Sequence, residues 1–156
     1  RDRSPSRGLG DVYKRQDALG VKNPVLSEFG ECMFTGELES ETDIHDFAKL
    51  AKKNLDCKGL RYTDIKDRVK KVAVSSGAGG SNVFDAALAG VDVLVTGEIK
   101  HHEIIAANSL GIDIIDAGHF KSEDVVILPL VNRLSEKFSD IIFTKSQSCD
   151  DMIKFI

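Results

Sequence analysis

Apolar runs and helical apolar spacing alternate through the second half of this chain. Residues 69–75, 91–96 and 112–117 each form a nearly continuous run of β-branched and other apolar residues. Such runs are typical of strands that are buried on both faces of a sheet. Helices are expected between them, over about residues 81–89 and 101–110. This β-α-β-α-β order predicts an α/β fold with parallel strands and right-handed crossovers.

The segment before this alternation has a weaker pattern. Residues 31–38 are its strand-like stretch, and residues 60–62 suggest a short strand. Between them we expect an amphipathic helix that has Ser40 as its N-cap and ends near Leu55, because acidic residues follow Ser40 in the first turn. His45 lies off the apolar face of this helix and is expected to be a solvated surface residue.

The segment after the alternation predicts one more helix and one more strand. Ser122 is expected to cap the helix, which should bend or restart at Pro129 because proline lacks a backbone N–H. Residues 141–144 are expected to form the strand. The helix is expected to turn five apolar side chains inward, namely Val125, Leu128, Val131, Leu134 and Phe138.

The composition is that of one ordinary soluble domain, with 42% hydrophobic and 29% charged residues. The formal charge of -4 gives no basic footprint, so nucleic acid is not an expected partner. The chain lacks both a membrane-length apolar run and the pattern of a signal peptide, so no membrane is expected and the expected location is the cytoplasm. Cys32, Cys57 and Cys149 are widely spaced, which favours free thiols over a disulfide framework or zinc ribbon.

Residues 1–16 differ in character from the rest of the chain. Basic residues stand there among Ser, Pro and Gly without apolar periodicity, and the stretch resembles the translated adapter leader found at the head of environmental sequence assemblies. A natural flexible tail is the alternative. The domain is therefore expected over residues 17–156, with residues 1–16 as a non-native or disordered leader.

Polar groups follow three of the expected parallel strands. The loops are S-S-G-A-G-G-S at residues 75–81, T-G-E-I-K-H-H-E at residues 96–103 and D-A-G-H-F-K-S-E at residues 116–123. In open α/β sheets ligands gather at the carboxyl ends of the strands. We therefore expect the three loops to meet at one edge of the sheet and to form the site.

His119 and Glu123 are the candidate metal ligands. An imidazole nitrogen and a carboxylate suit zinc, manganese or iron, and the four-residue gap brings a strand end and the first turn of a helix together. Gly118 allows a sharp turn beside the ion. The alternative is a capped helix with a hydrogen-bonded histidine.

His101 and His102 adjoin Glu98 and Glu103, which makes a second candidate cluster for general-base or ligand chemistry. One histidine of the pair is expected to line the site, and a polar helix start with two solvated histidines is the alternative. The glycine loop at residues 75–81 suits an anionic oxygen at a helix N-terminus. A tight turn that lets the backbone pass close to its neighbour is the alternative there.

Read together, the motifs G-A-G-G-S, T-G-E-x-K-H-H and D-A-G-H-F-x-S-E over residues 70–123 resemble the C-terminal part of the Nif-three-like family of dinuclear-metal proteins. Proteins of this family are also catalogued as GTP cyclohydrolase I type 2 homologues. The resemblance extends more loosely from about Leu19 to Phe143. It implies a mixed, largely parallel sheet flanked by helices, apparently truncated at its N-terminal half.

The resemblance also implies a centre of two divalent ions, which are Zn, Fe, Mn or Mg, with His119 and Glu123 as ligands. The family's remaining ligands include a His-His-Pro element, which this chain lacks because Glu103 follows His101 and His102. Weak or partial metal binding is therefore expected of this chain alone. Glu98, His101 and His102 are the candidate catalytic residues, for proton transfer or substrate contact.

Three functions remain open from the sequence. The first is a metal-dependent hydrolase of a small, nucleotide-like substrate, in which the intact parent is a homohexameric ring and this fragment is inactive. The second is a non-enzymatic, ring-forming metal-binding protein with a regulatory or interaction role. The third is a metal-free nucleotide-binding module that uses the glycine loop.

Overall fold

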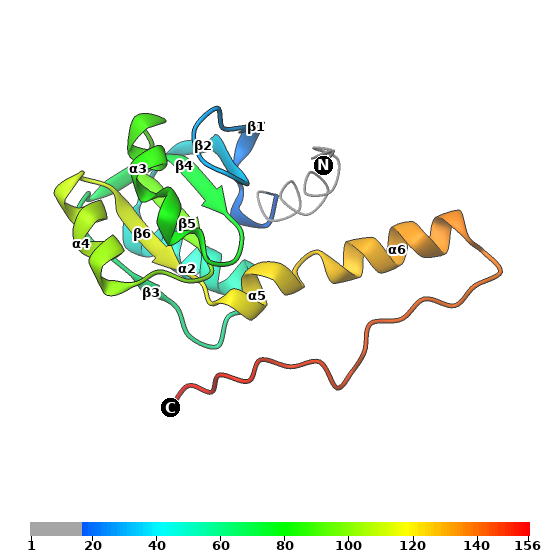
Figure 1. Cartoon of the computed structure of the whole chain (residues 1–156). Helices are drawn as coiled ribbons and strands as arrows, with labels where there is room; N and C mark the ends of the chain where they lie inside the picture. The colour runs from blue at the N-terminus through cyan, green and yellow to red at the C-terminus, as the bar shows by residue number, and fades with distance from the viewer. Residues whose placement is uncertain (1–16) are drawn as a thin grey trace.

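Three parallel strands form the centre of a six-stranded sheet in the computed structural model, which describes residues 17–156 (Figure 1). The order across the sheet is β1-β2-β4-β5-β6-β3. The parallel strands are β4 (Arg68–Ser75), β5 (Val93–Thr96) and β6 (Asp113–Asp116). The antiparallel additions are β1 (Lys22–Leu26) and β2 (Met33–Asp43) beside β4, and β3 (Arg61–Tyr62) beside β6. The expected α/β fold with a mixed sheet is confirmed.

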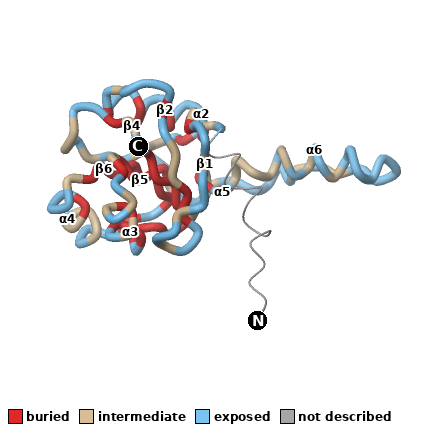
Figure 2. The backbone as a smooth tube through the Cα atoms, turned by 90° about the horizontal axis from the view of Figure 1, so that it is seen from above, coloured by how far each residue is buried: buried red, intermediate tan, exposed pale blue. Residues whose placement is uncertain are grey.

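Helices cover both faces of this sheet. One core cluster joins α2 (Ile44–Asn54) to Val72, Val74, Val93, Val95 and Ile115. The other joins α3 (Val83–Leu88) and α4 (His101–Ser109) to Ala73, Leu94 and Ile114. Successive residues of a strand point to opposite faces of the sheet. Because both faces are buried, apolar residues follow one another along these strands, which explains the continuous apolar runs. Figure 2 shows the buried segments gathered in this layered part of the chain.

The helix expected to start after Ser40 starts later. β2 continues to Asp43, with Thr42 opposite Val69 and Asp43 opposite Arg68 in the register with β4. Asp43 is the N-cap of α2, and its Oδ1 accepts hydrogen bonds from the backbone N–H groups of His45 at 2.9 Å and Asp46 at 3.2 Å. Ser40 was therefore the wrong cap, because strand pairing outweighed a local capping pattern. The predicted end near Leu55 and the exposure of His45 are confirmed.

The structure corrects the prediction for the last third of the chain. A short helix, α5 (His119–Asp124), begins after Gly118 rather than at Ser122, and α6 (Ile127–Lys137) follows it. Pro129 lies in the first turn of α6, where no intrahelical partner awaits its missing N–H, so the break falls before it. Residues 141–144 are not a strand, and the side chain of Ile142 is 92% exposed.

The inward face expected for the last helix was also wrong. Val125 packs against the core, but α6 buries none of its residues, and Leu128 is 59% exposed. Figures 1 and 2 show α6 projecting away from the sheet. Apolar periodicity predicts a helix correctly, but it does not name the surface that the helix packs against. Within residues 17–156, no helix has the length and apolarity that a membrane crossing requires.

Two carboxylates accept hydrogen bonds from backbone N–H groups at the amino ends of the parallel strands. Asp113 is fully buried and accepts hydrogen bonds from the backbone N–H groups of Ile65 at 2.8 Å and Lys66 at 2.9 Å. Asp92 accepts from the backbone N–H groups of Lys70 at 3.0 Å and Lys71 at 2.8 Å, and from the Lys66 ammonium at 2.6 Å. Burial raises the pKa of Asp92, but these hydrogen bonds outweigh it and hold that pKa below the usual 3.8.

This arrangement predicts a pH-dependent role for Asp92 in stability. Asp92→Ala should lower the free energy of unfolding by about 1–3 kcal/mol at neutral pH, because two strand N–H groups lose their acceptor. The pKa of the folded state is the lower one, so the stabilisation is fully present above the unfolded pKa of 3.8 and is lost as the pH falls through the folded value. Urea unfolding of both proteins at neutral and acidic pH measures the difference. A difference that grows towards acidic pH would contradict this role.

Candidate functional site

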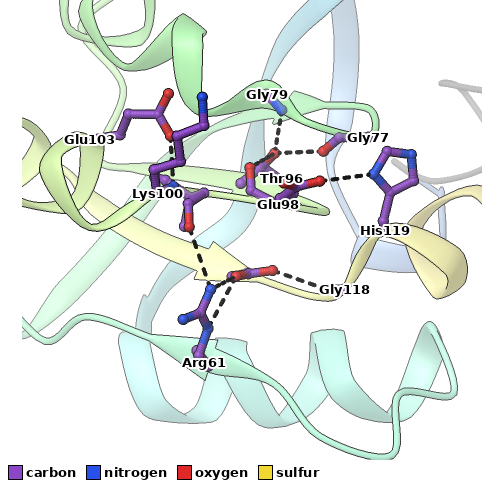
Figure 3. Close-up of polar contacts among 11 residues, drawn as sticks. Arg61, Gly77, Gly79, Thr96, Glu98, Lys100, Glu103, Gly118 and His119 are labelled. Carbon is purple, nitrogen blue, oxygen red and sulfur yellow. Dashed lines mark hydrogen bonds and ion pairs between the residues drawn. The ribbon is translucent and has the colours of Figure 1, made fainter. Parts of the chain in front are cut away.

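The loops after β4 and β5 interlock through one carbonyl group. The Gly77 carbonyl oxygen accepts the Gly97 N–H at 2.9 Å. It also accepts the Thr96 hydroxyl at 3.1 Å (Figure 3). The Thr96 hydroxyl in turn accepts the Gly79 N–H at 2.9 Å, and this side chain is buried. The expected meeting of the first two loops at the carboxyl edge is confirmed. The buried Thr96 hydroxyl links the two loops through its hydrogen bonds.

The third loop joins them at the start of α5. Gly118 has a φ of +82°, which favours glycine, and its N–H donates to Asp116 at 3.2 Å. Arg61 reaches from β3 to the same carboxylate through its Nε at 3.1 Å and through an ion pair from its terminal nitrogen (Figure 3). This clamp fixes the corner that carries His119. The turn expected at Gly118 is confirmed.

Small residues allow α5 to lie directly on the β5 loop. A Cβ atom at Gly97 would lie 2.3 Å from the Ser122 hydroxyl oxygen and 3.0 Å from the His119 Cα. Ser122 is buried, and its hydroxyl donates to the His119 carbonyl at 2.8 Å. The serine expected to cap a helix therefore packs inside its first turn instead.

His119 stands between two carboxylates. Its Nδ1 lies 3.4 Å from Glu98 Oε2, and its Nε2 lies 3.4 Å from Glu123 Oε1. The imidazole is 49% exposed, so solvent reaches the group. The structure therefore brings together the two predicted ligands and Glu98, one of the three predicted catalytic residues.

The spacing of Nε2 and Oε1 suits two ligands of one ion. Bonds of about 2.0–2.2 Å in a tetrahedral site place neighbouring ligand atoms about 3.3–3.5 Å apart. The 3.4 Å separation lies in that interval and is longer than a usual hydrogen bond. Gly77 leaves space there, because a Cβ atom on it would lie 2.9 Å from Glu123 Oε1 and 3.2 Å from His119 Nε2.

A cavity of about 450 Å³ opens beside this pair. His119 and Glu123 line it together with Phe120 and Ile127, and residues 149–153 of the C-terminal segment close its other side. Glu98 is not among the residues that line it. His119 and Glu123 therefore border a space that is large enough for a small ligand.

The described residues offer two candidate ligands for a metal ion. Within residues 17–156, no group of three or more His, Cys, Asp or Glu side chains converges as a metal site does. A catalytic zinc ion generally has three protein ligands, and His119 with Glu123 gives two. Donor chemistry and spacing fit a divalent ion, whereas the number of ligands fits partial binding.

His101 and His102 begin α4, and both are exposed. Neither has a hydrogen bond or ion pair to His119 or Glu123. Glu103 has a structural role, because its Oε2 accepts the Lys100 N–H at 2.7 Å and so caps the helix (Figure 3). The arrangement resembles the alternative of a polar helix start more than a second ligand cluster.

The glycine loop is used for close packing. A Cβ atom at Gly80 would lie 2.0 Å from the Glu103 carboxylate, and one at Gly79 would lie 2.5 Å from the Ser75 hydroxyl. Asn82 donates to that hydroxyl at 2.8 Å. These contacts support the tight-turn interpretation of the loop.

Residues behind the site hold α5 in place. Lys121 pairs with Asp56 at 2.7 Å, and this hydrogen bond lowers the pKa of the Asp56 carboxyl and raises that of the Lys121 ammonium. The Cys57 thiol donates to the Ala117 carbonyl at 3.2 Å, and burial raises its pKa to about 11. Sequence reasoning gave no role to Arg61, Asp56 or Cys57, because each acts across a large separation along the chain.

Comparison with known proteins adds a family and a fold. The model of the Duf34/NIF3 (NGG1p interacting factor 3) family matches residues 2–150. A relative from Clostridium perfringens, named GTP cyclohydrolase 1 type 2 homolog, is 34% identical over 137 residues, which are 86% of this chain and 52% of the relative. The chain therefore spans about half the length of that relative.

Two solved structures are similar to the described chain. A Bacillus cereus protein related to NIF3 is 33% identical with a TM-score of 0.74, over 80% of this chain and 36% of that one. A hypothetical protein of Staphylococcus aureus has a TM-score of 0.81 at 21% identity, over 94% of this chain and 64% of that one. The second likeness shows a shared fold. The leader expected at residues 1–16 lies outside the described residues.

The packing of α5 on the β5 loop predicts that Gly97→Ala is destabilising. The added methyl group collides with Ser122 and the His119 backbone, so the free energy of unfolding should fall by about 1–3 kcal/mol. Adding Ser122→Ala removes the nearest atom and should restore part of that loss, measured as a double-mutant cycle in urea. Strictly additive effects would show that Gly97 and Ser122 do not press on each other.

Proposed function

The chain belongs to the Duf34/NIF3 family, and from that premise we propose that His119 and Glu123 are ligands of a divalent metal centre in a metal-dependent hydrolase. The observation that carries the proposal is the 3.4 Å separation of His119 Nε2 and Glu123 Oε1 beside a cavity. Both side chains come from one turn of α5, which the Gly97 and Gly118 contacts hold in position. The pair is thus arranged before any ion arrives.

The substrate class that we propose is a nucleotide-like small molecule. Support comes from the relative's name, GTP cyclohydrolase 1 type 2 homolog, and from the cavity of about 450 Å³. A bound divalent ion polarises a substrate oxygen or makes water a nucleophile near neutral pH. Phe120 and Ile127 are apolar residues of the cavity lining that a ring could contact, and the polar lining consists of His119 with Glu123, Asp124, Asp150 and Asp151.

Glu98, His101 and His102 remain the candidates for proton transfer or substrate contact. Glu98 is the one beside a proposed ligand, and the two histidines lie along the edge at the start of α4. A second ion, the homohexameric ring and a cytoplasmic location also belong to this proposal for the whole protein. The ions would be Zn, Fe, Mn or Mg.

A non-enzymatic metal-binding role in a ring-forming regulatory or interaction protein is the second candidate. It is favoured by the ligand count, because residues 17–156 offer His119 and Glu123 without a third converging ligand. This number is below the three protein ligands that a catalytic zinc ion generally has.

Zinc binding tests the proposed ligands directly. In calorimetric titrations with Zn²⁺, His119→Ala and Glu123→Gln should each lower the affinity more than about tenfold, because each removes one of two protein ligands. His45→Ala and Glu28→Gln are matched controls, since both side chains are exposed and lie in other elements. Equal affinities in all five proteins would refute a centre at α5.

Turnover separates the enzyme from the regulatory candidate. The full-length Clostridium relative, loaded with Zn²⁺ or Mn²⁺, should release formate from GTP or hydrolyse another member of a nucleotide panel. Replacing the residues that align with His119 and Glu123 should abolish this activity. Bound metal without turnover across the panel would favour the regulatory role. Nucleotide affinity that survives the same replacements would point to a metal-free nucleotide-binding module.

A further inference from the structure

The two nitrogens of His119 are not equivalent. The Nδ1 contact to Glu98 Oε2, at 3.4 Å, has the direction of a hydrogen bond (Figure 3). The Nε2 contact to Glu123 Oε1 is equally long, but it satisfies only the distance of an ion pair. Glu98 thus lies where a proton on Nδ1 would point, whereas Glu123 lies off the direction that a hydrogen bond from Nε2 would take.

We propose that Glu98 is the residue that positions His119 for metal binding, by accepting the Nδ1 proton and leaving Nε2 unprotonated on the side of Glu123. This inference rests on the proposed metal centre. A neutral imidazole has one N–H donor and one acceptor nitrogen, and only the acceptor nitrogen binds a metal. A carboxylate on the far nitrogen fixes both the tautomer and the orientation of the ring.

The arrangement of the loops supports this division of roles. Nε2 lies 3.4 Å from Oε1 of Glu123, the second proposed ligand, and Glu98 is not among the residues that line the cavity. Glu123 is four residues from His119 on α5, whereas Glu98 follows Gly97, whose N–H is tied to the Gly77 carbonyl. The β5 loop therefore places the Glu98 carboxylate at Nδ1 of the imidazole. Glu98 would act on the metal indirectly, through His119.

An off-axis carboxylate at Nε2 is what a shared ion requires. When two ligands lie at neighbouring corners of a tetrahedron, the second atom is displaced by roughly 35° from the line between the first atom and the ion. A direct hydrogen bond to Nε2 would instead place Glu123 on that line. The geometry therefore assigns Glu123 to the ion and Glu98 to the Nδ1 proton.

The tautomer of His119 tests the positioning role without metal. In ¹⁵N spectra of the imidazoles of the full 156-residue chain at pH 8, wild-type His119 should be mainly protonated on Nδ1. Glu98→Ala should shift the population towards Nε2–H. His45 is an internal control, because its Nδ1 lies 2.6 Å from the Tyr62 hydroxyl and should not respond. An unchanged His119 tautomer in Glu98→Ala would overturn the proposal.

Zinc affinity supplies the second readout. Glu98→Ala should weaken Zn²⁺ binding by about 10- to 100-fold, and Glu98→Gln should weaken it less, because an amide oxygen still accepts the Nδ1 proton. Glu28→Ala, another exposed loop glutamate, should leave the affinity unchanged. Wild-type affinity in Glu98→Ala would overturn the positioning role, and complete loss, equal to that of Glu123→Ala, would make Glu98 a ligand instead.

The two proposals fail in different ways. If wild type binds Zn²⁺ no better than His119→Ala, the metal centre at α5 is refuted, whatever Glu98 does. If wild type binds zinc and the Glu98 variants match it in both affinity and tautomer, the metal centre stands and the role of Glu98 is refuted.

Discussion

The candidate site depends on the hydrogen bonds that converge on the Gly77 carbonyl. The Gly97 N–H and the Thr96 hydroxyl both donate to it, so the loops after two neighbouring parallel strands are locked at their first residues. The lock is buried, and an unpaired polar group there would be costly, which makes the arrangement hard to open. Because α5 packs on Gly97, the direction of His119 and Glu123 follows from this lock.

Backbone polar groups find their hydrogen-bond partners in different ways at the two edges of the parallel sheet. At the amino edge, the carboxylates of Asp92 and Asp113 accept backbone N–H groups. At the carboxyl edge, glycines let backbone groups satisfy one another at close range, so the side chains of Glu98, His119 and Glu123 remain free to face solvent and the cavity. The carboxylates at the amino edge therefore stabilise the fold, whereas the candidate site lies at the carboxyl edge.

The sequence predicted the parts of this structure that depend on local pattern. The three buried strands, the helices between them and the turn at Gly118 follow from apolar runs and backbone freedom, and all were confirmed. The cap at Ser40 failed because pairing of β2 with β4 extends that strand to Asp43. The prediction that Ser122 caps a helix failed because the Ser122 hydroxyl packs against Gly97, which has no side chain. No local sequence pattern records such a contact.

Contacts between residues far apart along the chain are the other features that the sequence did not predict. The clamp of Arg61 on Asp116 joins residues that are 55 positions apart, and the contact of Glu98 with His119 joins residues 21 positions apart. The motif at residues 96–103 drew attention to Glu98, but only the fold shows that it faces the back of the imidazole. The periodicity of α6 likewise predicted a helix correctly and its partner surface wrongly.

A metal site with two ligands would depend for its affinity on how well the two side chains are oriented before the ion binds. Two ligands bind an ion weakly when each must first be oriented, because fixing each side chain costs conformational entropy. Here the backbone of His119 is fixed by Gly118 and Ser122, and its ring is held from behind by Glu98. If His119 and Glu123 are metal ligands as proposed, much of that ordering is complete before an ion binds.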